Sequence, residues 1–157
     1  MLPKSVEELD EIKEIAKSMV KKRALVSSGA VLIPAPGVDI AADVALLLEL
    51  LPGINRKFGL TPEQIDELDP QLKALMYGII KKVGSTLVGK VVTEKLISVT
   101  LQKVAGRMVA KQLVKYIPFF GQALAAALSG GAMIIVGNSH IDDCYDIAFS
   151  AIKARST

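Results

Sequence analysis

Residues 116–140 read YIPFFGQALAAALSGGAMIIVGNSH, a stretch with no charged side chain and many Ala and Gly residues. About 20 predominantly apolar residues are enough for a helix to cross a bilayer. Small residues equally suit the central helix of a compact bundle, because they let a neighbouring backbone come close. The glycines, together with Pro118, Gln122 and Asn138, weigh against insertion. We therefore expect a buried helix here, with a membrane span as the alternative.

The composition is that of a chain that buries much of its surface. Its 157 residues are 51% hydrophobic and 22% charged, which fits one domain with its own core. The net charge of +3 suits weak attraction to an anionic membrane face, not a dedicated nucleic-acid surface. With four Phe, three Tyr and no Trp, the chain offers few rings on which bases would stack. We expect no nucleic-acid partner.

Two further features bear on location. Cys144 is the single cysteine, so a disulfide within the chain is excluded and a reducing compartment is favoured. The opening residues MLPKSVEELDEIKE are acidic and amphipathic, unlike a secretory signal. The expected location is the cytoplasm, with peripheral or integral attachment at the inner membrane face.

The first helix has a clear start and stop. Ser5 and Glu8 make a capping box, and Pro34 and Pro36 end the helix near Leu32. Between these limits, one seam of apolar or small residues is interrupted only at a basic position, Arg23. The predicted seam consists of Leu9, Ile12, Ala16, Met19, Val26, Ala30 and Ile33.

Local signals predict three more helix starts. A helix begins near Asp39, is kinked or broken at Pro52, and ends at Gly59. Thr61-Pro62 with Gln64 then gives a capped short helix ending near Leu68, and Asp69-Pro70 repeats the start signal.

The remaining pattern is helical as well. Residues 70–116 keep helical spacing with an expected break between Gly84 and Gly89, and Pro118 opens the uncharged helix. Residues 141–153 return to amphipathic spacing, and no segment shows sustained strand alternation. The sequence thus predicts an all-α single domain over residues 1–157, a bundle of about six helices around a hydrophobic helix rich in small residues.

The segment Gly84–Lys90, GSTLVGK, matches most of a phosphate-binding loop. Position 91 is Val where Ser or Thr should hold magnesium, and helical spacing precedes the segment where a buried strand is required. A glycine pair that packs closely within a helix is the simpler interpretation.

A second cluster offers potential metal ligands within about one helical turn: His140, Asp142, Asp143 and Cys144. A closed zinc site needs a matched second half, which a chain with one His and one Cys does not supply. We expect the acids to start the last helix instead, and we expect no metal, no cofactor and no catalytic residues.

The remaining candidate function is contact with a membrane or with a protein partner. Ala123, Ala127 and Gly131 lie four residues apart on one face, with Ala126 and Gly130 on the adjacent stripe. Aromatic residues and lysines at the start of the uncharged stretch suit an interface with lipid headgroups. The candidate contact residues are Lys111, Lys115, Phe119, Phe120, Gly121 and Gly131.

Two blocks carry a family resemblance: IPAPGVDIAADVALLLELLPGINRKFGL at 33–60 and YIPFFGQALAAALSGGAMIIVGNSHIDDCYDIA at 116–148. A proline-glycine turn leads into an Asp-containing apolar helix that ends in Phe-Gly-Leu, and an Ile-Pro-x-x-Gly step later opens a small-residue helix. Pro36-Gly37, Asp43, Phe58-Gly59-Leu60 and Ile117-Pro118 with Gly121 occupy these places. This order resembles the C-terminal helical domain of immunity-related, interferon-inducible GTPases and a related bacterial helical domain that accompanies GTPases.

The resemblance covers a core at 24–150, preceded by an amphipathic helix at 1–23. It implies a non-catalytic module, here without a GTPase domain, that associates with membrane lipid or with a protein partner such as a GTPase. Three alternatives stay open: a pore-forming or membrane-inserting helical protein, a self-assembling scaffold that forms homo-oligomers, and a nucleotide-binding protein that uses Gly84–Lys90.

Overall fold

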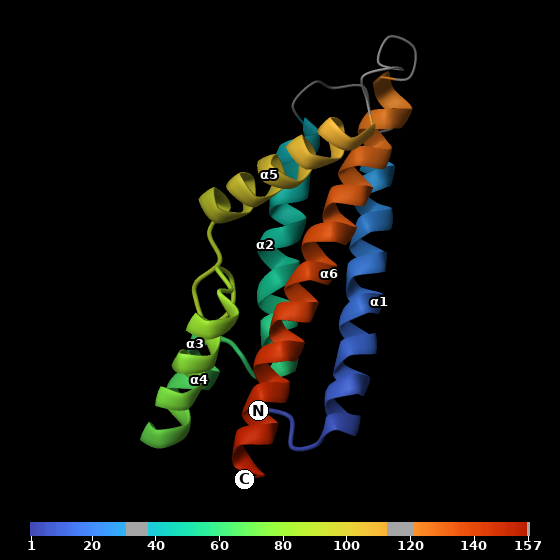
Figure 1. The fold of residues 1–157 in the computed structure, drawn as a ribbon. Helices are drawn as coiled ribbons and strands as arrows, with labels where there is room; N and C mark the ends of the chain where they lie inside the picture. The colour runs from blue at the N-terminus through green and yellow to red at the C-terminus, as the bar shows by residue number, and fades with distance from the viewer. Residues whose placement is uncertain (31–37, 113–120, 157) are drawn as a thin grey trace.

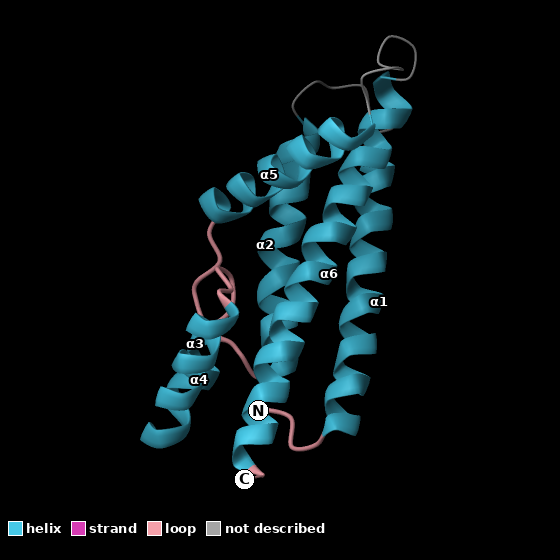
Figure 2. Cartoon of the chain, viewed as in Figure 1, coloured by secondary structure: helices cyan, strands magenta, loops and turns pink. Residues whose placement is uncertain are grey.

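The structure is a computed structural model that describes residues 1–30, 38–112 and 121–156; the side chains of 27–30, 38–42, 102, 105–112 and 121–130 are not described. This part of the chain forms six helices and no strand (Figure 2). The helices are α1 (Val6–Ala30), α2 (Val38–Phe58), α3 (Pro62–Asp66), α4 (Pro70–Val83), α5 (Glu94–Gln112) and α6 (Gly121–Arg155). The predicted all-α bundle of about six helices is confirmed.

The long helix α6 is the centre of the bundle. It packs against α1, α2, α4 and α5, and α1 packs against α2 as well. In Figure 1, α1, α2 and α6 lie side by side, α5 crosses them near one end, and α3 and α4 lie toward the other end. Both chain termini lie at the end where α2 and α6 finish. The predicted central helix is therefore present, and it continues through the amphipathic tail without a break.

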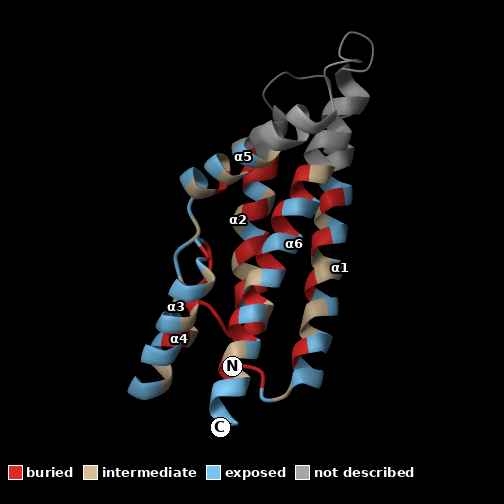
Figure 3. Ribbon diagram, in the orientation of Figure 1, coloured by how far each residue is buried: buried red, intermediate tan, exposed pale blue. Residues whose placement is uncertain are grey.

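The core follows from one apolar face on each long helix. On α2 the buried residues recur at three- and four-residue steps, the pattern of an amphipathic helix: Leu47, Leu50, Leu51, Ile54 and Phe58. On α6 the buried set includes Met133, Val136, Ile141, Cys144 and Ile147. Figure 3 shows these buried residues along α2 and α6 and on one side of α1.

The start of α1 is capped as predicted, with one difference. The amide of Glu8 donates to Ser5 Oγ at 3.2 Å, while the Glu8 carboxylate accepts from the amide of Lys4 at 2.8 Å. The acid thus reaches back one residue further than in the usual capping box. The first half of the predicted seam is buried or half-buried, namely Leu9, Ile12, Ala16 and Met19.

The buried face of α1 differs from the predicted seam near Arg23. Burial continues through Val20 and Ala24, whereas Val26, which was predicted on the seam, is exposed. The guanidinium of Arg23 donates to Glu49 of α2 at 2.6 Å, so this charged residue stays at the edge of the contact. Because the buried face passes to Val20 and Ala24, Val26 turns toward solvent.

The sequence predicts a kink or a break at Pro52, and the break does not occur, since α2 runs through this residue. A proline inside a helix lacks the amide hydrogen and costs about 3 kcal/mol. Leu50, Leu51 and Ile54 on either side are buried in the core. Each such side chain contributes about 1.5–3 kcal/mol when fully buried, so tertiary packing outweighs the local cost.

The short connections after α2 form as their local signals predict. Gly59 follows the end of α2, and Thr61 and Gln64 make a reciprocal capping box at α3. Asp69 accepts from the amides of Gln71 and Leu72 at the start of α4.

Candidate functional site

The predicted contact residues fall at one end of the bundle or outside the described part. Lys111 lies in the last turn of α5, Gly121 begins α6, and Gly131 is half-buried within α6. Residues 115, 119 and 120 (Lys115, Phe119 and Phe120) lie outside the described residues. The proposed contact role of all these positions stays a prediction.

The small-residue stripes of α6 are also only partly described, since side chains 121–130 are left out. In the described part, α6 comes close to α1 at Gly137. A Cβ at this position would lie 2.6 Å from Val20 Cγ2 of α1. Gly137 lies four residues after the buried Met133 on the same apolar seam, and this spacing is the sequence signal that could have identified it.

No helix in the described ranges is both long enough and apolar enough to cross a membrane. Residues 116–120 of the uncharged stretch lie outside those ranges, and the rest of the stretch belongs to α6.

Two exposed apolar side chains lie near the end of α1. Leu25 is 74% exposed and Val26 is 56% exposed. Lys21 and Lys22, each four residues earlier than one of them, share this helix face and are exposed too. Neither lysine forms an ion pair with a residue that the structure describes. We call these four residues the α1 tip, an apolar surface with a basic band one turn behind it.

The α1 tip lies at the end of the bundle where the other predicted contact positions gather. In Figure 1, α1 and α5 end at this end of the molecule and α2 and α6 begin there. Lys111 and Gly121 therefore lie at the same end as Leu25, although they come from distant parts of the sequence. The α1 tip is not predicted from the sequence, because the helical spacing places Val26 on the buried seam.

The glycines of the Gly84–Lys90 segment lie in the loop between α4 and α5. Gly84 has φ 77° and Gly89 has φ 66°, conformations that glycine adopts readily. The predicted break between them is confirmed, and it extends to Glu94, where α5 starts. The prediction of a glycine pair packed within a helix is wrong, because both glycines supply turns that end or follow α4.

The amides of this loop bond within the protein. Leu87 and Val88 donate to Ser85 Oγ, and Gly89 donates to the carbonyl of Leu60. A phosphate-binding loop points such amides at the ligand and follows a strand. Here the amides already have acceptors and the preceding element is α4, so the loop lacks the arrangement that nucleotide binding requires.

A buried polar cluster joins α2, α6 and this loop. Asn55 donates from Nδ2 to the carbonyl of Leu87 at 3.2 Å, and the thiol of Cys144 donates to Asn55 Oδ1 at 3.4 Å. His140 Nε2 lies 3.7 Å from Cys144 Sγ. Asn55 is not among the predicted site residues, although its place four residues after Leu51 puts it on the apolar face of α2.

The Cys144 and His140 pair does not have the properties of a nucleophilic site. A reactive cysteine needs a lowered pKa, which a neighbouring imidazolium supplies. Burial instead raises the pKa of the Cys144 thiol well above its ordinary value. Burial also lowers the pKa of His140 to about 4, opposed by the nearby backbone of Leu51. Both groups are neutral at pH 7, so the cluster supports the packing of the helices.

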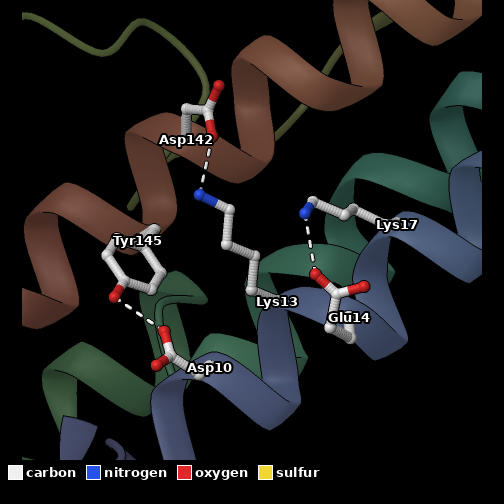
Figure 4. Close-up of polar contacts among 6 residues, drawn as sticks. All are labelled: Asp10, Lys13, Glu14, Lys17, Asp142 and Tyr145. Carbon is white, nitrogen blue, oxygen red and sulfur yellow. Dashed lines mark hydrogen bonds and ion pairs between the residues drawn. The ribbon is translucent and has the colours of Figure 1, made fainter.

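At the surface edge of the contact between α1 and α6, polar side chains of the two helices interact (Figure 4). Lys13 Nζ lies 3.2 Å from Asp142 Oδ1 and 4.4 Å from the centre of the Tyr145 ring. The Tyr145 hydroxyl donates to Asp10 Oδ1 at 2.7 Å. Exposed ion pairs of this kind contribute about 0–1 kcal/mol each, so their main effect is to fix the register of the two helices.

The predicted helix start at Asp142 and Asp143 is wrong. Both acids lie in the middle of α6, which runs unbroken from Gly121 to Arg155. Asp142 pairs with Lys13, and the nearby side chain of Ser85 opposes the rise in the pKa of Asp143 that burial causes. Within the described residues, no three His, Cys, Asp or Glu side chains gather in a way that would hold a metal ion.

The fold and these contacts define an all-α helical domain organised around one long helix. Interferon-inducible GTPase 5 of Bos taurus is 34% identical to this chain over 130 residues, which cover 82% of the chain and 28% of that protein. Interferon-inducible GTPase 5 of Rattus norvegicus is 32% identical over 158 residues, 98% of the chain and 34% of that protein. No protein-family model matches the chain, and no solved structure matches it.

The chain is thus related by sequence to the interferon-inducible GTPases, as the resemblance predicted. It spans only about a third of the length of these relatives. The match falls on a part of them outside their GTPase domain, which agrees with a helical domain that carries no phosphate-binding loop in its described part.

Proposed function

We propose that this chain is a non-catalytic helical domain that attaches to the anionic face of a membrane through the α1 tip. In this role it works beside a GTPase, either in the same polypeptide or as a partner. The observation that carries the proposal is the exposure of Leu25 and Val26 next to Lys21 and Lys22, two lysines that form no ion pair within the described part of the chain.

The physical basis is shallow insertion. Apolar side chains at the end of a helix enter the boundary between headgroups and acyl chains, while lysines remain at the level of the headgroups. Each lysine near an anionic membrane surface contributes about 1 kcal/mol. The two lysines of the α1 tip lie one turn behind the apolar pair, which is the spacing that this arrangement needs.

Another predicted contact residue lies at the same end of the bundle as the α1 tip. Lys111 belongs to the last turn of α5, which ends at this end of the bundle. The relatives are named GTPases, and the chain resembles a part of them outside the GTPase domain, which favours an accessory role over a catalytic one.

Flotation of the chain with vesicles tests the proposal. The chain is expected to float with vesicles of phosphatidylcholine and phosphatidylserine and to bind pure phosphatidylcholine vesicles much more weakly. Replacing both lysines (Lys21→Gln with Lys22→Gln) should weaken binding to the anionic vesicles by about 2 kcal/mol, or about thirtyfold. The matched control is Lys81→Gln with Lys82→Gln, which removes two exposed lysines from the end of α4 and should leave binding unchanged.

A second pair of variants separates the apolar contribution. Leu25→Ser with Val26→Ser should reduce flotation, whereas Val91→Ser, at an exposed apolar position of the α4–α5 loop, should not. Retention of an encapsulated dye during binding distinguishes attachment from pore formation. If the chain stays unbound with both kinds of vesicle, membrane attachment through the α1 tip is ruled out and a protein partner becomes the better explanation.

A further inference from the structure

A cavity of about 260 Å³ lies between α5, α6 and the loop after α4. Its polar lining comes from all three elements: Thr86 of the loop, Lys103 of α5, and Ser139, His140 and Asp143 of α6. Thr86 and Leu87 of the segment that resembles a phosphate-binding loop thus form one wall of the cavity.

His140 is the buried polar group of this cavity. The side chain is only 2% exposed, and its Nδ1 has no hydrogen-bond partner within the described structure. The other ring nitrogen, Nε2, faces Cys144 Sγ at 3.7 Å. A buried ring nitrogen normally has a polar partner, and His140 is part of the lining of the cavity.

The cavity also holds charged groups of both signs. Lys103 is exposed at its mouth and forms no ion pair with a described residue. Asp143 is half-buried, and burial raises the pKa of its carboxyl group, opposed by the nearby side chain of Ser85. The apolar part of the cavity wall comes from Leu87, Val104 and Val136.

We propose that this cavity binds a compact zwitterion of the amino-acid class, with its ammonium group at Asp143 and its carboxylate at Lys103. The hydroxyls of Thr86 and Ser139 and the imidazole of His140 complete the polar contacts. A ligand of about nine non-hydrogen atoms fits the volume, taking about 30 Å³ for each water-sized atom group. Convergent polar groups in a partly apolar hollow are the usual form of a small-molecule site.

Titration of the ¹⁵N-labelled chain with glycine, serine, β-alanine and γ-aminobutyrate tests the proposal. At least one of these zwitterions should give saturable amide shifts that concentrate at Thr86, Ser139 and His140. Acetate and methylammonium, which carry one charge each, should shift the same amides at least about tenfold more weakly. Shifts that do not saturate with any zwitterion, or that sodium chloride reproduces, would mean that the cavity holds water only.

Variants test which residue binds each charged group of the zwitterion. Lys103→Met and Asp143→Asn should each raise the dissociation constant of the best zwitterion about tenfold or more, because each removes a charged hydrogen-bond partner. The control is Lys95→Met, an exposed lysine on α5 outside the cavity, which should bind as the unmodified chain does. Thermal melts check that each variant is folded. Folded Lys103→Met protein with unchanged affinity would overturn the assignment.

Discussion

Val20 of α1 lies directly against Gly137 of α6, so close that a Cβ at position 137 would come 2.6 Å from Val20 Cγ2 and 2.8 Å from Cγ1. Valine has two methyl groups on Cβ and a restricted χ1, so it cannot rotate both away. The spacing of the two longest helices in the described part, α1 and α6, therefore depends on the absence of a side chain at Gly137.

Gly137→Ala should destabilise the fold by about 1–3 kcal/mol, measured by urea unfolding at pH 7. The cost of overpacking exceeds the gain of about 1 kcal/mol that alanine brings to a helix. Gly78→Ala on α4 is the matched control, because its added Cβ would meet no atom within 4 Å, and it should stabilise by up to about 1 kcal/mol. Adding Val20→Ala to Gly137→Ala should recover part of the loss. Equal stabilisation by both alanine variants would contradict the close contact.

The features that the sequence predicted well are those set by neighbouring residues. The cap formed by Thr61 and Gln64 needs only residues three apart, and it forms as expected. The pairing of Val20 with Gly137 depends on the register of two helices from opposite ends of the chain, which periodicity does not give. Val26 was misplaced for the same reason, since its exposure follows from where Arg23 meets Glu49.

The buried state of His140 should make stability depend on pH. Its folded-state pKa is lowered from 6.5 to about 4, so the unfolded chain binds more protons between these values and stability is lost as pH falls through this window. The difference, 6.5 minus 4, corresponds to about 3 kcal/mol at 1.36 kcal/mol per unit. The contribution of His140 to the free energy of unfolding is fully present above pH 6.5 and is lost below about pH 4.

Unfolding free energies from pH 7 to pH 4 measure this effect, with His140→Gln as the comparison. His140 is the only histidine in the chain, so the slope between pH 6.5 and pH 5 should largely disappear in the variant. Asp143 acts in the opposite direction, because burial raises the pKa of its carboxyl group and protonation then favours the folded state. A slope that persists unchanged in His140→Gln would show that His140 is not its source.

Asn55→Ala should destabilise the fold by about 2–4 kcal/mol. The amide of Asn55 bonds the carbonyl of Leu87 and the thiol of Cys144, and its removal leaves both groups buried without this partner. Asn138→Ala, at an exposed position of α6, should change stability by less than about 0.5 kcal/mol. Chemical denaturation of both variants tests the difference, and similar small losses would mean that the buried cluster contributes little.

Cys144 should report the opening of the bundle. Its side chain is fully buried and burial raises the pKa of its thiol, so a thiol reagent should react only after the surrounding helices open. Because it is the single cysteine, the reaction has one possible site. When closing is faster than labelling, the labelling rate follows the population of the open state, so each 1.4 kcal/mol lost in Gly137→Ala should accelerate labelling about tenfold.

The same reaction in denaturant gives the labelling rate of the fully accessible Cys144 thiol. Native labelling near that rate would show that the thiol is accessible in the folded bundle, and acceleration far above the measured loss of stability would show that α6 opens locally.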